Sequence, residues 1–144
     1  MIEIKNKKAY FDYTIIEELE AGIVLTGTEI KSIRKGSCDI KDTFVNIKNN
    51  EAYVLNMYIA KYEEGNIFNH DERRTRKLLL HKKEILKLKE KIKIDGLTII
   101  PLKLYFNKNK VKLLIGVCKG KKLYDKRQSL KEKDVKKETR NYKI

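Results

Sequence analysis

Apolar and polar positions alternate in several short runs of the chain, and this pattern predicts a mainly β protein. A β-rich run at residues 23–26 lies between Gly22 and Gly27, as is typical of a strand that approaches other backbone closely at its ends. A short helix should follow, with Thr28 as its N-cap and Gly36 as its left-handed stop. We expect this strand and helix to organise the rest of the chain.

Two pairs of β-rich runs predict two hairpins. Residues 43–48 and 52–59 are separated by Asn49-Asn50, which tolerates positive φ and fits a tight turn. Residues 97–106 and 111–118 form the second pair, and the latter alternates cleanly between apolar and other positions. In the second run of the first hairpin we expect one face to comprise Tyr53, Leu55, Met57 and Ile59.

A helix is predicted between the hairpins by apolar spacings of three and four. It follows a long loop at residues 62–76 and ends at Asp95-Gly96. Residues 13–20 fit either a strand or a short helical turn. The only proline, Pro101, cannot donate to a sheet ladder, so it should lie at an edge, a bulge or a barrel seam. The inward stripe of the helix is expected to be Leu78, His81, Ile85, Leu88 and Ile92.

The order of these elements predicts the fold class. Strand, helix, hairpin, helix and hairpin in so short a chain favour a small antiparallel barrel of the oligonucleotide-binding type, with five or six strands and short helices. Residues 1–119 would form this barrel domain. Residues 120–144 carry ten basic and four acidic residues with few large apolar ones, so we expect a basic C-terminal tail that is disordered when free. Ser129 with Glu132 forms a capping box, which favours a helix once an anionic surface neutralises the lysines.

Charge narrows the class of partner. The 144 residues include 34 Lys and Arg against 20 Asp and Glu, a formal charge of +14 that favours RNA, DNA or an anionic membrane surface. Cys38 and Cys118 lie far apart and have no partner at metal spacing, so neither a disulfide framework nor a zinc site is expected, and no cofactor or metal is predicted. Neither a signal peptide nor a membrane span is evident, so we expect a cytoplasmic protein.

Four runs of sequence carry a resemblance to a known family. Residues 20–32, 74–80, 101–105 and 116–127, in this order, closely resemble the small protein B (SmpB) family of bacterial SsrA-binding proteins. The resemblance implies a non-enzymatic factor of trans-translation, which rescues stalled ribosomes and tags their peptides. Such a factor binds the tRNA-like domain of transfer-messenger RNA (tmRNA) and delivers the alanyl-charged RNA with elongation factor Tu. With the resemblance we also expect a monomer that does not bind membranes.

The resemblance also assigns roles to individual residues. Glu20 would accept a hydrogen bond from a base amino group or a ribose hydroxyl, which Lys and Arg cannot do. The residues assigned to RNA binding are Asn6, Glu20, Lys31, Leu79 and His81, with Arg74, Arg76 and Lys77 as a phosphate clamp. The tail would become helical on the ribosome, in the decoding centre of the small subunit and the empty mRNA channel, through Gly120, Lys121, Lys122, Tyr124, Asp125, Lys126, Arg127 and Lys131. Tyr124 stands where many members carry His, and its ring can still stack on a base.

Other interpretations of the same residues remain open at this point. Glu20 is also compatible with a solvated or salt-bridged acid at a strand end, and Leu79 with a core position beside the helix stripe. A general RNA-binding module, such as a ribosomal protein with a barrel of this type, would explain the charge and the fold. A small ribonuclease using His70 or His81 as acid and base is the third possibility.

Overall fold

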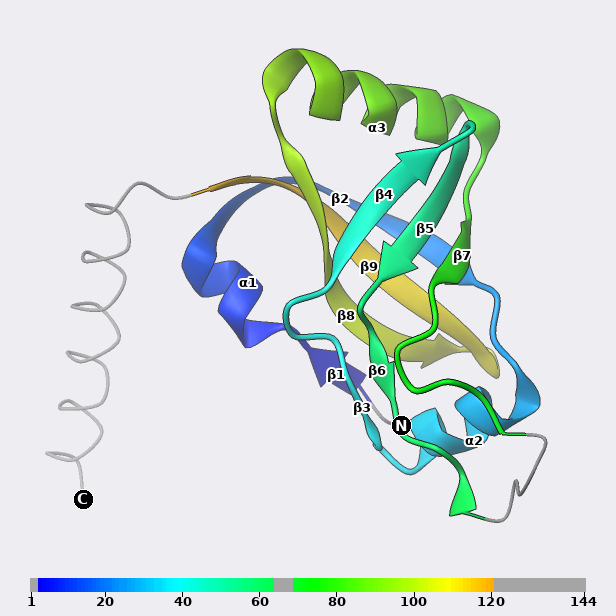
Figure 1. Cartoon of the computed structure of the whole chain (residues 1–144). Helices are drawn as coiled ribbons and strands as arrows, with labels where there is room; N and C mark the ends of the chain where they lie inside the picture. The colour runs from blue at the N-terminus through cyan, green and yellow to red at the C-terminus, as the bar shows by residue number, and fades with distance from the viewer. Residues whose placement is uncertain (1–2, 64–68, 121–144) are drawn as a thin grey trace, which may run out of the picture.

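The computed structural model describes residues 3–63 and 69–120. Within them, three helices accompany one seven-stranded antiparallel sheet with the strand order β1-β8-β9-β2-β7-β5-β4 and one two-stranded sheet of β3 and β6 (Figure 1). The helices are α1 (Lys7–Asp12), α2 (Gly27–Arg34) and α3 (Lys82–Asp95). The strands are β1 (Glu3–Lys5), β2 (Tyr13–Ile23), β3 (Cys38–Asp39), β4 (Phe44–Lys48), β5 (Glu51–Leu55), β6 (Tyr58–Ile59), β7 (Arg76–Leu79), β8 (Thr98–Asn107) and β9 (Lys110–Gly120).

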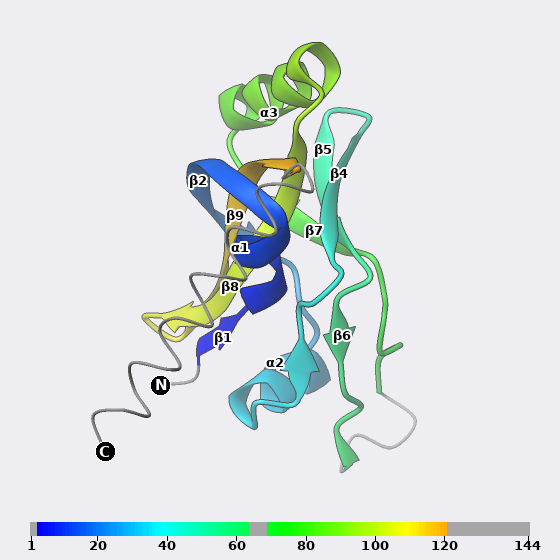
Figure 2. The same cartoon turned by 90° about the vertical axis from the view of Figure 1, so that its left-hand side faces the viewer.

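The main sheet is strongly curled, so that β4 comes into contact with β8. Figure 2 shows β8, β9 and β2 on one side and β4 and β5 on the other, with α3 at one end and α2 at the opposite end. The hydrogen-bonded ladder of the described residues is open, because β1 and β4 are its edge strands. The predicted class, a small mainly antiparallel β-barrel-like domain with short helices, is confirmed. The expected count of five or six strands is wrong, since the main sheet has seven.

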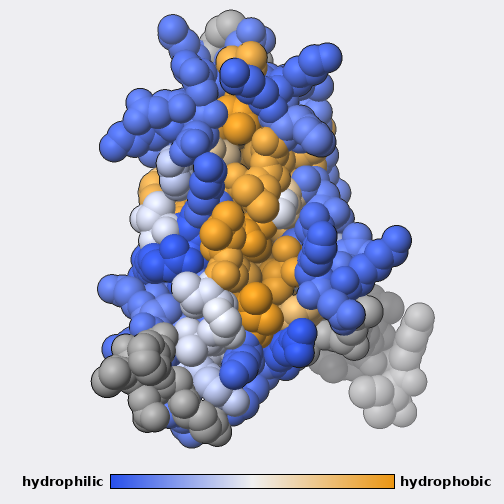
Figure 3. Space-filling view, turned by 90° about the vertical axis from the view of Figure 1, so that its right-hand side faces the viewer, coloured by the Kyte–Doolittle hydropathy of each residue, from blue (hydrophilic) through white to orange (hydrophobic). Residues whose placement is uncertain are grey.

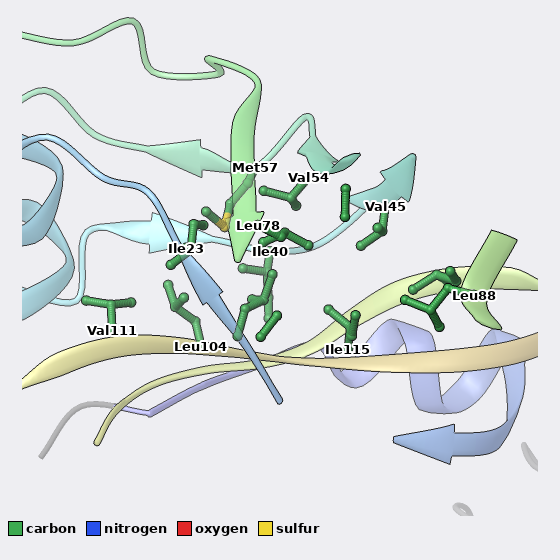
Figure 4. Close-up of a cluster of buried hydrophobic side chains, with 14 of the residues drawn as sticks. Ile23, Ile40, Val45, Val54, Met57, Leu78, Leu88, Leu104, Val111 and Ile115 are labelled. Carbon is green, nitrogen blue, oxygen red and sulfur yellow. The ribbon is translucent and has the colours of Figure 1, made fainter. Parts of the chain in front are cut away.

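The core fills the inside of the curled sheet. Val54, Leu78, Leu104 and Ile115 are buried there and come from four different strands, while Leu88 reaches the same cluster from α3 (Figure 4). Burial of such side chains stabilises the fold by roughly 1.5–3 kcal/mol each relative to exposure. No helix in the described ranges 3–63 and 69–120 has both the length and the apolar character required to cross a bilayer.

The central segment differs from its prediction in the bounds of its strand and in the N-cap of its helix. The strand expected at residues 23–26 is instead β2, which begins ten residues earlier and ends at Ile23. The N-cap of α2 is Thr26 rather than Thr28, because Thr26 forms a capping box with Glu29: its amide donates to the Glu29 carboxylate at 2.8 Å. Gly36 does follow the helix with a positive φ of 75°, as predicted.

The first hairpin has the predicted turn but a different buried face. Asn49 and Asn50 both have positive φ, 51° and 59°, and join β4 to β5. Ala52 and Val54 are the buried residues of β5, so the expected shared face of Tyr53, Leu55, Met57 and Ile59 is wrong. The reason is Asn56, whose φ of 65° ends the strand and reverses the side-chain alternation, after which Met57 and Ile59 are buried.

In the second half of the chain, some predictions are confirmed and others are wrong. The predicted helix exists, with Ile85 and Leu88 turned inward and Gly96 as a left-handed C-cap. Leu78 and His81 do not belong to this helix, because Leu78 lies in β7, where it pairs with Ala52 of β5, and α3 starts at Lys82. The register of β8 against β9 shifts between Pro101 and Lys103, which confirms the expected bulge. The short elements β1 and α1 were not predicted.

Candidate nucleic-acid interface

One row of side chains crosses the outer face of the main sheet. Tyr105 of β8 is paired with Lys112 of β9, Lys112 with Gly22 of β2, and Gly22 with Leu79 of β7. Residues directly opposite in antiparallel strands share a face of the sheet. Glu20 lies two residues from Gly22 along β2 and therefore on this same outer face, whereas Ala21 is buried.

A pocket of about 550 Å³ opens on this row. It brings together four of the residues predicted to bind RNA, although they come from β2, β7 and the start of α3. Its lining includes Glu20, Gly22, Lys77, Leu79, His81 and Lys112. The pocket therefore combines cationic, acidic and apolar side chains, the mixture that recognition of a folded RNA requires: phosphate contacts, hydrogen-bond acceptors and a surface for bases.

Leu79 presents its side chain to this pocket rather than to the core. It is 56% exposed, whereas its neighbour Leu78 is 1% exposed. A Cβ atom on Gly22 would lie 3.2 Å from Leu79 Cβ, so the absence of a side chain at Gly22 leaves the space that Leu79 occupies. The alternative that Leu79 is a core residue is wrong. With Val24, which is 43% exposed, it contributes apolar surface, and on the side of the molecule where β7 lies, Figure 3 shows an apolar stripe between hydrophilic side chains.

Glu20 is exposed and has one protein partner. The hydroxyl of Tyr105 donates a hydrogen bond to Glu20 Oε2. Burial, followed by this hydrogen bond and the negative charge of Glu20, raises the pKa of Tyr105 to about 12. The phenol is therefore protonated at neutral pH and acts as the donor. Among the described residues, no hydrogen bond reaches the second carboxylate oxygen, Glu20 Oε1.

A second acid, Glu51, lines the same pocket but is saturated by protein partners. Its Oε1 lies 3.1 Å from Lys77 Nζ, and its Oε2 accepts a hydrogen bond from the Tyr53 hydroxyl at 2.5 Å. The hydrogen bonds from Tyr53 and Lys77, with the charge of Lys77, lower the pKa of Glu51. Lys77 thus reaches the pocket as part of an exposed ion pair.

The three residues of the predicted phosphate clamp differ in their exposure, and Arg76 is buried. Arg76 is 0% exposed, and its Nε donates to the buried carboxylate of Glu29. Its Nη1 donates to the Met57 carbonyl at 2.6 Å and its Nη2 to the carbonyls of Asp71 and Glu72. A side chain that is buried and fully occupied in this way has no donor for a phosphate, so the expectation for Arg76 is contradicted. Its role here is to hold together α2, β7 and the segment before β7.

Arg74 is part of the same ion cluster but remains partly exposed. Its Nη2 lies 2.6 Å from Glu29 Oε1, and 36% of its side chain is exposed. Glu29 thereby receives both arginines as well as the Thr26 amide. Burial acts to raise the pKa of Glu29, but the hydrogen bonds from Arg74, Thr26 and Arg76 outweigh it, so the pKa of Glu29 lies below its ordinary value.

This lowered pKa predicts the pH dependence of stability. A carboxyl whose pKa is depressed by folding stabilises the native state above its unfolded pKa of about 4.3 and loses that contribution as pH falls through the folded value. We expect Glu29→Gln to lower the free energy of unfolding at pH 7 and the deficit to shrink at pH 3. Urea unfolding of both proteins at the two pH values measures this, with Glu90→Gln on the exposed part of α3 as a control. A deficit that is equal at both pH values would contradict the assignment.

Asn6 and Lys31 lie apart from the pocket. The Asn6 side chain is 3% exposed, donates to the carbonyls of Ile40 and Pro101 at 3.1 and 2.9 Å, and caps α1 by accepting from the Ala9 amide. These contacts explain its burial, and a direct contact with RNA stays a prediction. Lys31 Nζ lies 5.3 Å from the centre of the Tyr62 ring on the exposed side of α2, and its RNA contact is likewise a prediction.

The two histidines occupy different environments. His70 is buried, and its Nε2 lies 2.9 Å from the Ile59 carbonyl, which can only accept. Its Nδ1, 2.9 Å from Thr28 Oγ1, therefore accepts from that hydroxyl. His70 thus connects α2 to β6, which favours a structural role. His81 is the exposed N-cap residue of α3, and its amide donates to Glu84 at 2.8 Å.

Gly120 is the last described residue, and it pairs with Tyr13 at the end of β9. The tail positions assigned to the ribosome lie outside the described residues, namely Lys121, Lys122, Tyr124, Asp125, Lys126, Arg127 and Lys131. Their roles therefore stay predictions. The proposed division into a domain at 1–119 and a tail at 120–144 is a prediction in the same sense.

Comparisons with known proteins give one consistent family. The sequence model described as "SmpB protein" matches residues 3–143. An SsrA-binding protein of Staphylococcus aureus strain JH1 is 59% identical over 134 residues, covering 93% of this chain and 87% of the relative. One from strain Newman is 58% identical with the same coverage. A solved structure described as "tmRNA-SmpB: a journey to the center of the bacterial ribosome" contains a similar chain, with 45% identity, a TM-score of 0.72, and coverage of 89% of this chain and 94% of that one.

Proposed function

The chain belongs to the SmpB family, and on this premise we propose that it binds the tRNA-like domain of tmRNA and delivers that RNA to stalled ribosomes. It acts as an RNA-binding factor of trans-translation, the process that rescues the ribosome and tags the unfinished peptide. Its partners are tmRNA and the ribosome, with elongation factor Tu and the alanyl-charged state of tmRNA as indirect partners. Its place of action is the cytoplasm, and it works without catalysis, as a monomer.

The observation that carries the proposal is the pocket on the outer face of β2 and β7. A basic protein with a formal charge of +14 would be expected to offer RNA only cations, yet here an acid and an exposed leucine occupy the pocket. Glu20 accepts hydrogen bonds from base amino groups or ribose hydroxyls, and Leu79 gives an apolar surface for a base that is not stacked within a helix. These features select a folded RNA with exposed bases over phosphate alone.

Cations around the pocket supply affinity. Lys82 and Lys112 line it, together with Lys77. Such lysines neutralise phosphates and release counterions, so they add affinity that falls with salt and does not depend on sequence. Discrimination then rests on Glu20 and Leu79, and affinity for RNA in general rests on the lysines.

We assign the tail a separate task. Residues 121–131 carry five lysines or arginines, with Tyr124 and Asp125 among them. The basic residues follow phosphates in the vacant mRNA channel, while the ring of Tyr124 stacks on a base of the decoding centre. The tail becomes helical there, as its capping box and helix-forming residues favour.

A titration against three RNAs tests the proposal. The tRNA-like domain of tmRNA, an ordinary tRNA and an unstructured RNA of equal length are compared near 0.2 M salt, where non-specific binding to phosphate is suppressed. We expect a preference of about a thousandfold for the tRNA-like domain over the unstructured RNA, by analogy with specific readers of DNA. Equal and steeply salt-dependent binding to all three would instead favour a general RNA-binding module.

Glu20→Ala is expected to weaken binding of the tRNA-like domain by about tenfold, since a hydrogen bond to a charged acceptor contributes about 1.5–3 kcal/mol. The direction is informative, because removing an acid from a basic surface should strengthen non-specific binding to RNA. Glu3→Ala, which removes another exposed acid from β1, is the matched control and should leave the preference intact. Unchanged or tighter binding of the tRNA-like domain by Glu20→Ala would refute the role of Glu20.

A further inference from the structure

Tyr105 reaches across a strand to touch the acid of the RNA pocket. In the strand order β8-β9-β2, Tyr105 lies opposite Lys112, and Glu20 lies opposite Leu114. Strand β9 therefore lies between the two residues, and their partners on it, Lys112 and Leu114, are two residues apart. Their side chains nevertheless meet above β9, where the Tyr105 hydroxyl donates to Glu20 Oε2. The contact joins positions 85 residues apart in the sequence.

A comparison with Glu51 shows what this contact does. Both acids line the pocket and both accept a hydrogen bond from a tyrosine. The other oxygen of Glu51 accepts from Lys77, so each of its two oxygens already has a protein partner. Glu20 is held by one oxygen only, and the other has no hydrogen bond from the described residues. Of the two acids that the sheet contributes to the pocket, Glu20 is thus the one held through a single oxygen. The third acid of the lining, Glu84, caps the start of α3 by accepting from the His81 amide.

We propose that Tyr105 is a positioning residue for specific RNA recognition: it fixes the Glu20 carboxylate so that Oε1 faces the bound RNA. The inference rests on the proposed function and adds to it a residue that does not itself need to touch the RNA. A free glutamate loses side-chain entropy when a ligand fixes it, and a carboxylate that is already held avoids part of this loss on binding.

The hydrogen bond from Tyr105 to Glu20 is expected to persist around neutral pH. The pKa of Tyr105, raised to about 12, keeps the hydroxyl protonated well above neutral pH, so it remains a hydrogen-bond donor. The tyrosine then donates and the glutamate accepts without competition from another protonation state. The ring of Tyr105 is itself only partly exposed, which limits the positions its hydroxyl can take.

Tyr105→Phe tests the inference because it removes the hydroxyl and keeps the ring. We expect its affinity for the tRNA-like domain to fall by about two- to tenfold, the usual effect of having to immobilise one more side chain on binding. Its affinity for unstructured RNA and its melting temperature should change little. The matched control is Tyr58→Phe, because Tyr58 also hydrogen-bonds a glutamate, Glu72, but does not line this pocket.

A double-mutant cycle separates positioning from direct contact. If Tyr105 acts through the carboxylate, Tyr105→Phe should cause no further loss of affinity in a Glu20→Ala background, which removes the acceptor altogether. In addition, ¹³C NMR of the tyrosine Cζ atoms should show a lower pKa for Tyr105 in Glu20→Gln than in the wild type, because the charge and the strong acceptor are gone.

Each other outcome has a distinct meaning. Equal losses for Tyr105→Phe in both backgrounds, an unchanged affinity of the single variant, or an unchanged pKa of Tyr105 in Glu20→Gln would overturn the inference while leaving the proposed function standing. A wild-type protein that binds the tRNA-like domain no better than unstructured RNA would overturn the proposed function, and the positioning role with it.

Discussion

Arg76→Met is expected to lower the free energy of unfolding by about 3–5 kcal/mol, the cost of breaking a buried ion pair by removing one partner. The substitution keeps the apolar stem of the side chain but removes the donors to Glu29 and to the Met57, Asp71 and Glu72 carbonyls. Glu29 would then keep only Arg74 as a charged partner. Equilibrium unfolding in urea, followed by circular dichroism, measures the change.

The adjacent Lys77→Met is the matched control. Lys77 also belongs to β7 and also pairs with a glutamate, but the Lys77–Glu51 pair is exposed. Exposed pairs contribute about 0–1 kcal/mol, so we expect a change within that range. Similar losses for the two variants would mean that burial of Arg76 does not set its contribution. A large loss for Arg76→Met alone would also establish that this arginine of the sequence motif stabilises the fold rather than binding phosphate.

Ending the chain after Gly120 is expected to abolish peptide tagging on stalled ribosomes and to leave binding of the tRNA-like domain largely intact. The pocket lies on β2, β7 and α3, all within the described residues, whereas the proposed ribosomal contacts follow Gly120. The loss of ten basic residues should weaken binding at low salt and have little effect near 0.2 M salt. A reconstituted translation reaction on an mRNA without a stop codon measures tagging, and a titration measures binding.

A chain in which residues 121–144 are scrambled is the control for charge. It keeps the composition and net charge of the tail but loses the order of its motif and its capping box. We expect it to fail in tagging as the truncated chain does. Full tagging by the scrambled chain would show that positive charge alone suffices, and parallel loss of binding and tagging on truncation would contradict the division of tasks.

Much of the fold was predictable because its signals are local. The Asn49-Asn50 turn, the Gly96 stop and the Pro101 bulge each follow from what a single residue allows its own backbone to do. The errors lie where one residue changes the pattern. Asn56 interrupts a run that looks like one strand. Leu78 fits the apolar spacing of the helix that follows, so the predicted helix wrongly included this residue of β7.

The pocket was predictable only in part. Resemblance to a family placed Glu20 and Leu79 in it, and the structure brings both to one outer face. The sequence could not show that Arg76 is buried, because its partner Glu29 is 47 residues away and an arginine in a basic motif is usually exposed. Tyr105 was missed for the same reason. Only the alternation along β8 indicated that its side chain points outward, because the preceding residue, Leu104, is buried.

Strand β9 connects the pocket with the end of the described chain. Lys112 near one end lies in the RNA pocket, and Gly120 at the other end is where the tail begins. At about 3.4 Å per residue, the eight residue-to-residue steps from Lys112 to Gly120 span about 27 Å along the strand. Because β9 is hydrogen-bonded on both sides, to β8 and β2, this length is held without a hinge. Under the proposed function, β9 therefore sets the distance between the RNA bound in the pocket and the residue from which the tail continues.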